Sequence, residues 1–250
     1  MVGFKLINDG FKKIFSGEHS WLTHISLFAI CGICSVITTL FQETAKTKMT
    51  PDFGLAIFGG ILVFVLYLYL TGYSLTFMHK SFYEDEAGLP DVDERPFITL
   101  AKALPLLITW MFYYIATILL SVFVKILIIP VIVLLLIISP FVSFVFVSFS
   151  KEYNIKGLFN IILPFKYFVP TLSSIVIQGL CFIPLWILAL IPTVLVVILL
   201  NIAGVKTSSG LPAYMVAMIG AYISFIIQML WNYSLVQIFK DKIDINSQQN

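Results

Sequence analysis

Three side-chain amides lie inside long apolar segments, where they are the groups best able to bind a solute or a neighbouring helix. Gln178 lies in one segment, and Gln228 and Asn232 lie four residues apart in another. Residues spaced i and i+4 share one face of a helix. Amides on such a face either hydrogen-bond to a neighbouring helix or line a polar cavity. The sequence leaves both alternatives open: packing between helices, or a water-filled pocket lined by the three amides.

Carboxylates, which often serve ion and proton pathways in membranes, are missing from the apolar segments. No acidic residue occurs between Arg95 and Glu152 or between Glu152 and Asp241. The sequence therefore disfavours a proton-coupled mechanism. It contains no nucleophile motif, phosphate-binding loop or zinc-binding helix motif. We accordingly expect no enzymatic activity, no bound cofactor and no metal centre.

Cys31 and Cys34 form a C-x-x-C pair, a spacing that often indicates a redox or metal site. The pair lies in the middle of the apolar run Trp21–Phe41, where the surroundings disfavour the reactive thiolate. We interpret both as small packing residues on one helix face. His24, near the start of the same run, is likewise interpreted as an interfacial or packed side chain.

The segment from His79 to Lys102 is the most strongly acidic part of the chain. Oxygen ligands at this density could hold Ca²⁺ or Mg²⁺, but the spacing of an EF-hand is absent. We interpret the segment as a solvated loop or as a docking site for a basic protein partner. Its acidic residues are Glu84, Asp85, Glu86, Asp91, Asp93 and Glu94.

The composition places the chain in a lipid bilayer. Of its 250 residues, 60% are hydrophobic and only 11% are charged, whereas a soluble domain carries about 25% charged residues. The net charge of +2 gives no electrostatic case for binding nucleic acid, which needs clustered basic residues.

Apolar blocks of sufficient length predict an all-α, multi-pass transmembrane helical bundle, since one span needs about 20 apolar residues. We expect a single integral membrane domain at 1–242 and a polar C-terminal tail at 243–250. Lys125 divides one long block into two spans. The proline-rich fifth block is interpreted as one long kinked helix, and seven spans would result if Phe168–Phe182 formed its own element. The six predicted spans are about 21–41, 54–78, 104–124, 126–149, 169–202 and 211–239.

The distribution of Lys and Arg between the loops predicts the orientation, because cytoplasmic loops carry the excess of positive residues. With six spans, eleven basic residues fall on one side and four on the other. Both termini should therefore be cytoplasmic, in the cytoplasmic membrane. The four residues on the outer side are Lys46, Lys48, Lys125 and Lys206.

Basic amphipathic segments precede the first, third and fifth spans. In the first, apolar residues recur every three or four positions between Phe4 and Ile14, with lysines between them. This pattern is typical of a helix that lies along the membrane surface, and we expect this helix at Phe4–Phe15. Similar segments occur at 95–107 and 155–168. The chain is thus consistent with three repeats of a surface helix plus a membrane hairpin.

Several short motifs resemble a known family. They are the Gly72-Tyr73 pair ending the second span, the loop residues Gly88, Leu89 and Pro90, the Tyr113-Tyr114 element and the amphipathic segment Ile155–Phe168. In these the chain resembles an uncharacterised prokaryotic family of six-span membrane proteins, described as a domain of unknown function. It is more weakly similar to the membrane domain of some glycerophosphodiester phosphodiesterases. The catalytic domain of those enzymes is absent here, so the resemblance implies no activity.

Two functional hypotheses follow. The first is a non-enzymatic membrane protein that organises lipid or protein partners through its basic surface helices and acidic loop. The alternative is a transporter, or a membrane subunit of one, for a neutral or amphiphilic solute. The lack of buried carboxylates favours the first.

Small residues at Ala213, Ala217 and Ala221 indicate a helix interface, either internal or between subunits, so the oligomeric state stays open.

Overall fold

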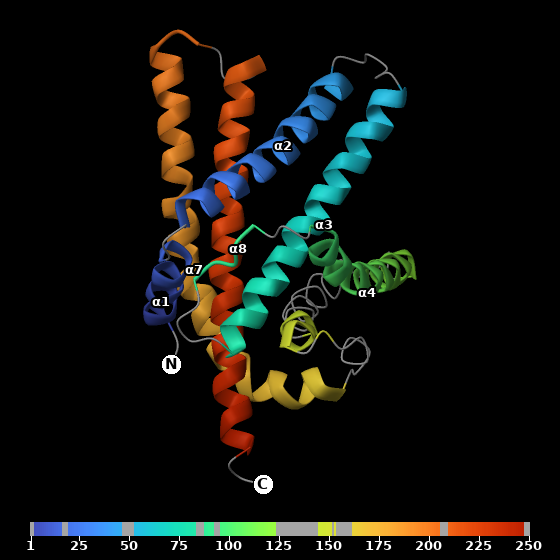
Figure 1. Ribbon diagram of the computed structural model, residues 1–250, viewed down its shortest axis with the longest axis vertical. Helices are drawn as coiled ribbons and strands as arrows, with labels where there is room; N and C mark the ends of the chain where they lie inside the picture. Colours follow the sequence, from blue (N-terminus) through green and yellow to red (C-terminus); the bar gives the residue numbers. More distant parts are fainter. Residues whose placement is uncertain are drawn as a thin grey trace.

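The computed structural model describes residues 3–16, 20–46, 53–83, 88–92, 96–123, 145–151, 153, 162–205 and 210–247. The regular secondary structure in these ranges is entirely helical, which confirms the predicted all-α class. A short helical segment lies at 145–151, in addition to the longer helices. Those are α1 (Phe4–Phe15), α2 (Ser20–Lys46), α3 (Phe53–Tyr83), α4 (Pro96–Phe123), α7 (Ile162–Ile202) and α8 (Gly210–Ser247) (Figure 1).

Among the described residues, four helices are long and apolar enough to cross a membrane. They contain the segments Ser20–Thr44, Ala56–Tyr83, Pro170–Ile202 and Gly210–Lys240. Large apolar side chains remain on their outer faces. In α7, for example, Leu199 is 64% exposed and Ile202 is 79% exposed. Water does not favour apolar surfaces of this extent, whereas lipid does. The protein is therefore a membrane protein.

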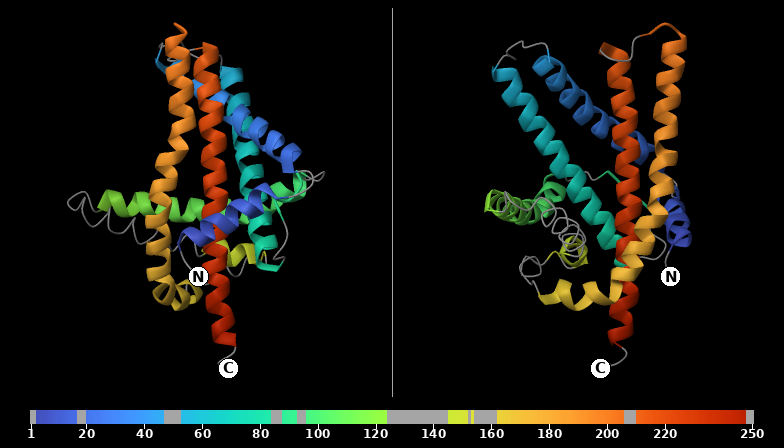
Figure 2. Two further views of the ribbon diagram at one scale, coloured as in Figure 1. Left: turned by 90° about the vertical axis from the view of Figure 1, so that its left-hand side faces the viewer. Right: turned by 180° about the vertical axis from the view of Figure 1, so that it is seen from behind.

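Helix α8 occupies the centre of the bundle and contacts α1, α2, α3 and α7. Figures 1 and 2 show α7 running beside α8. Helix α2 crosses α8, and α2 and α3 both diverge from α8 toward the end of the molecule opposite the C-terminus. The main hydrophobic core collects buried side chains of several helices around α8, including Leu27, Phe77, Met229 and Leu230. Each face of α8 is thus fixed by a different neighbour.

The fifth predicted span is one continuous helix, and Phe168–Phe182 is not a separate element. Helix α7 contains Pro170, Pro184 and Pro192 within its length. Its first part lies across the end of the bundle before the helix turns to run along α8 (Figure 1). A proline lacks the backbone N–H of a regular helix and permits such a bend.

The predicted third and fourth spans are not confirmed. Helix α4 covers most of 104–124, but its direction is crosswise to that of α7 and α8, and it lies to one side of them (Figures 1 and 2). The predicted span 126–149 falls mostly outside the described residues. Six spans and the threefold repeat therefore remain predictions. At the C-terminus, α8 continues to Ser247, so helix extends into the predicted polar tail.

Candidate functional site

Helix α1 has the predicted bounds and two different faces. One face is buried against the bundle, and its residues are Leu6, Ile7, Gly10, Lys13 and Ile14. The opposite face is open: Phe4 is 65% exposed and Phe15 is 51% exposed, and Lys5, Asn8 and Lys12 beside them are also exposed. We call these five exposed residues the basic–aromatic ridge. The apolar stripe predicted from the sequence is therefore divided between the protein interior and its surroundings.

Gly10 allows the middle of α1 to approach α8 closely. A Cβ atom at Gly10 would lie 3.0 Å from side-chain carbons of both Leu230 and Tyr233. Beside this contact, the Lys13 ammonium lies 5.6 Å from the centroid of the Tyr233 ring, a cation–π distance. Helix α1 is thus packed closely against α8.

The N-terminal end of α1 is held by a buried amide of α7. The Gly3 N–H donates to Gln178 Oε1 at 2.7 Å, and Gln178 Nε2 donates to Ser234 Oγ of α8 at 3.2 Å. The Gln178 side chain is fully buried. Because the first N–H groups of a helix have no hydrogen-bond partner within it, the bond to Gln178 satisfies a donor that would otherwise be unpaired.

The C-terminal end of α1 is held by His24 of α2. The Ile14 carbonyl can only accept, so His24 Nε2 carries the proton and donates to it at 3.2 Å. In the neutral ring, Nδ1 then accepts from the Tyr222 hydroxyl of α8 at 2.7 Å. The imidazole also stacks on Phe15, with 4.7 Å between ring centroids. The interpretation of His24 as a packed residue agrees with these contacts.

The three amides singled out in the sequence have separate environments. Gln178 anchors α1, as described above. Asn232 is buried, and its Nδ2 donates to Ser74 Oγ of α3 at 2.6 Å. Gln228 is exposed and lines two cavities. Within the described part of the chain, Gln228 is thus the one of the three amides that lines these two cavities.

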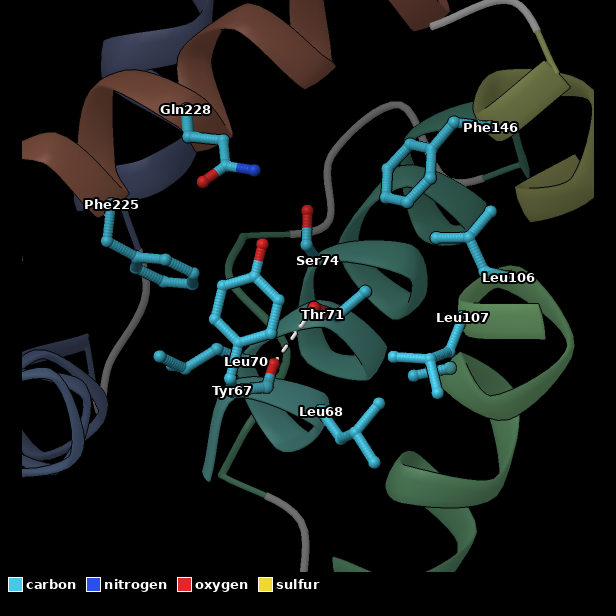
Figure 3. Close-up of a pocket in the computed structure, with 11 residues that line it drawn as sticks. Tyr67, Leu68, Leu70, Thr71, Ser74, Leu106, Leu107, Phe146, Phe225 and Gln228 are labelled. Atoms are coloured by element: carbon cyan, nitrogen blue, oxygen red, sulfur yellow. Dashed lines mark hydrogen bonds between the residues drawn. The ribbon is translucent and has the colours of Figure 1, made fainter. Parts of the chain in front are cut away.

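Those two cavities adjoin each other and are lined by residues of α2, α3, α4 and α8. The smaller, of about 180 Å³, is mainly apolar and is shown in Figure 3. The larger, of about 430 Å³, also has a mainly apolar surface, but hydroxyl, thiol and amide side chains contribute to its wall. Tyr67, Leu70, Phe225 and Gln228 line both. In Figure 3 the Gln228 amide points from α8 toward Tyr67 and Ser74 of α3.

Helix α2 has a polar face, not predicted from the sequence, that lines the larger cavity. Ser35, Thr38, Thr39 and Gln42 are spaced i, i+3, i+4 and i+7, the spacing of one helix face. Cys31 and Cys34 lie on the same wall, where Cys31 is buried and Cys34 is half-buried. Helical periodicity of polar residues within the first span was the signal that could have identified this face.

The predicted acidic docking loop is only partly within the described residues. Asp91 is exposed there, whereas Glu84, Asp85, Glu86, Asp93 and Glu94 lie outside the described ranges. The segment 88–92, which contains Asp91, packs against the bundle. The Tyr73 hydroxyl donates to the Pro90 carbonyl at 2.6 Å, and Leu89 packs on the main core. This part of the loop is therefore held in place and is not simply solvated.

A second polar cluster joins the end of α3 to the segment at 145–153. His79 Nδ1 donates to the Ser150 carbonyl at 3.0 Å, and the Tyr153 hydroxyl donates to the Leu75 carbonyl at 3.3 Å. Lys102 of α4 lies 5.1 Å from the centroid of the Tyr153 ring. Burial raises the pKa of Tyr153 to about 12, so its hydroxyl remains a donor at neutral pH. The cluster fixes the first half of α4 against α3.

Comparisons of the chain with protein-family models, with curated proteins and with solved structures each find no match. In the described part of the chain, no group of three His, Cys, Asp or Glu side chains is placed to hold a metal ion. The functional conclusion therefore rests on the docked α1 helix and on the paired cavities.

Proposed function

We propose that the protein is a non-enzymatic, multi-pass protein of the cytoplasmic membrane that organises lipid or protein partners at the cytoplasmic face. The observation that carries this proposal is helix α1. It is anchored at both ends and in its middle, yet it leaves the basic–aromatic ridge open. A helix with exposed aromatic and basic residues is suited to the boundary between lipid head groups and acyl chains.

The charges of the ridge favour anionic lipid as the first partner. Each Lys near an anionic membrane surface contributes about 1 kcal/mol of attraction. Lys5 and Lys12 are exposed on the ridge, and Phe4 and Phe15 provide apolar surface beside them. Since α1 is fixed to three other helices, lipid gathered at the ridge would be held at a defined place on the bundle.

The arrangement of the helix ends supports the proposed orientation. The C-terminal ends of α2 and α7 lie at the same end of the molecule as the N-terminal ends of α3 and α8, opposite the C-terminus (Figure 1). Lys46 lies at that end, as expected for the side with few basic residues. In the proposed topology of six spans, this end faces away from the cytoplasm and both termini face it.

Lipid selectivity tests the proposal. The full-length protein is placed in bilayers that contain spin-labelled phosphatidylglycerol or phosphatidylcholine, and the motionally restricted fraction of each lipid is measured. We expect the wild type to prefer phosphatidylglycerol. The Lys5→Gln/Lys12→Gln double variant should lose this preference at sites beside α1, by about fivefold per lysine.

The matched control is Lys5→Arg/Lys12→Arg, which keeps both charges and should keep the preference. Unchanged selectivity in Lys5→Gln/Lys12→Gln would contradict a lipid-organising role for α1. Equal losses in both double variants would point to altered packing of the helix and would also count against the charge-based role.

The second candidate function is transport of a neutral or amphiphilic solute. The specific observation that favours it is the pair of adjoining cavities with Gln228 in their common wall. Solute flux through liposomes containing the wild type, compared with Gln228→Leu, would test this candidate. It requires a path across the membrane, whereas the first proposal requires only a surface.

A further inference from the structure

The walls of the two cavities between α2, α3, α4 and α8 share residues, and the wall of the larger one has in addition a row of hydroxyl side chains and an amide on α2. We propose that together they bind one uncharged amphiphile. Its hydroxyl-bearing head group would occupy the larger cavity, and its hydrocarbon chain would occupy the smaller one. This inference does not depend on lipid binding at α1 or on transport, because a bound amphiphile need not cross the membrane.

The larger cavity offers hydrogen-bond acceptors to the head group. Thr38 Oγ1 donates to the Cys34 carbonyl at 2.8 Å, and Thr39 Oγ1 donates to the Ser35 carbonyl at 2.9 Å. Both hydroxyl hydrogens are thus used within α2, and the oxygen lone pairs remain to accept. Ser224 lies on the α8 side of the same cavity. A head group that donates several O–H groups matches this wall.

The smaller cavity suits a hydrocarbon chain. Its wall includes Leu68, Leu106, Leu107, Phe146 and Phe225, which surround the space in Figure 3. One of its hydroxyls, that of Thr71, donates to the Tyr67 carbonyl at 2.9 Å and is thereby satisfied within α3. Burying an alkyl chain there removes apolar surface from water or from a polar head-group region.

Gln228 stands where the head group and the chain would meet. Its side chain is exposed and lines both cavities, and the structure gives it no hydrogen-bond partner within the described part of the chain. An amide can donate and accept at once, so it can bond to an ester or a hydroxyl at the junction of the ligand. Among the described wall residues there is no Asp, Glu, Lys, Arg or His. A charged ligand would lack a counter-charge there, whereas an uncharged one needs none.

Photolabelling of the full-length protein in lipid nanodiscs tests this site. The probe is a 1-monoacylglycerol with a diazirine in its acyl chain, and unlabelled monoolein is the competitor. We expect saturable labelling that monoolein suppresses, with cross-links on the helices that line the smaller cavity. A fatty acid probe with the same chain should label at least about fivefold less, because its carboxylate would have no counter-charge.

Two variants locate the ligand, and a third serves as the control. Gln228→Leu removes the amide at the junction, and Ser224→Phe fills the larger cavity. Each should reduce competed labelling at least about fivefold. Leu199→Phe adds a similar ring at an exposed position of α7 and should leave labelling unchanged.

Labelling that monoolein does not suppress, that maps away from the cavity walls or that Ser224→Phe leaves unchanged would overturn the proposal. Normal labelling of a folded Gln228→Leu protein would do the same. If Gln228→Leu fails to fold, the Ser224→Phe result decides alone.

Discussion

Individual polar side chains hold the helices of this protein to one another inside an apolar environment. Gln178 joins α7 to both α1 and α8, and Asn232 joins α8 to α3. Bonds of this kind between membrane helices contribute about 0.6 kcal/mol on average and up to about 1.7 kcal/mol. Their value for function lies mainly in placing α1, because an anchored helix presents its outer face in one orientation.

Replacing Gln178 by Leu should release the N-terminal end of α1. The Gly3 N–H and the Ser234 hydroxyl would both lose their partner, and each buried polar group left unsatisfied costs about 1–3 kcal/mol. A nitroxide label at exposed Asn8 should then show increased mobility in its EPR spectrum. Gln237→Leu is the matched control, since the hydrogen bond of Gln237 within the described part of the chain goes to the Ser81 carbonyl of α3, at 3.4 Å, and not to α1. Equal spectra for Gln178→Leu and wild type would show that this amide does not anchor α1.

The bond between Asn232 and Ser74 should appear as an energetic coupling. Asn232→Leu, Ser74→Ala and the double variant form a thermodynamic cycle. We expect a coupling of about 1 kcal/mol in unfolding measurements on the purified protein, because the 2.6 Å contact is buried. Strictly additive effects of the two substitutions would mean that the contact contributes nothing to stability.

The sequence could identify these polar residues but not their partners. Helical spacing correctly placed Gln228 and Asn232 on one helix, because that relation is local. Gly3, the partner of Gln178 at the start of α1, is 175 positions away from it in the chain, and Ser74, the partner of Asn232, is 158 positions away. Such contacts depend on how helices cross, which the periodicity of a single chain does not contain. The same limit explains why the sequence alone groups Gln178 with Gln228, although the structure gives the two side chains separate surroundings.

At the scale of elements, α1 was predictable because its pattern is strong and local. Apolar residues at helical spacing between lysines gave its bounds, which the structure has at Phe4–Phe15. The spans in α2, α3, α7 and α8 were predictable from the length of their apolar runs. The direction of α4 was not, since apolar composition determines neither the tilt nor the packing of a helix.

The crossing of α3 and α4 depends on a glycine, and this yields a prediction for the pair of elements. A Cβ atom at Gly72 would collide with the backbone carbonyl of Thr99 in α4. Gly72→Ala should therefore push the helices apart and lower the free energy of unfolding by about 2 kcal/mol or more. Gly60→Ala, on the same helix, meets nothing within 4 Å. It should be neutral or slightly stabilising, since Ala is the better helix former by up to about 1 kcal/mol.

Equal melting temperatures for Gly72→Ala and Gly60→Ala, measured in the same detergent, would contradict the close crossing. The contrast is informative because the two substitutions are chemically identical and differ only in what lies beside the added methyl group.

The depth of α1 in the bilayer is a further test at this scale. The exposed ridge places Phe4 on the outer face of the helix, whereas Asp9 lies about 140° around the helix axis and is half-buried. In a background without native cysteines, a nitroxide at Phe4 should be more accessible to oxygen and less accessible to a water-soluble nickel chelate than one at Asp9. The reverse order would mean that the ridge faces water.

At the scale of the whole molecule, α8 is the central helix, and the two surfaces to which we assign functions lie on different sides of it. Helix α1 packs on one side, with its ridge open. The paired cavities are lined by residues of α2, α3, α4 and α8. In Figure 2, α3 and α4 lie on the side of α8 opposite α1. Variants of the ridge and of the cavities share no residue, so their effects should be separable. The lipid-organising proposal rests on one premise, namely that α2 crosses the membrane and leaves α1 in the cytoplasm.

Sidedness of single cysteines tests that premise most directly. Asn8→Cys and Lys46→Cys, each in a background without the native cysteines, are labelled with a membrane-impermeant maleimide in intact cells and in inside-out vesicles. We expect Lys46→Cys to react only in intact cells and Asn8→Cys only in inside-out vesicles. Reaction of both positions from the same side would show that α2 does not cross the membrane, and a reversed pattern would place α1 outside the cytoplasm.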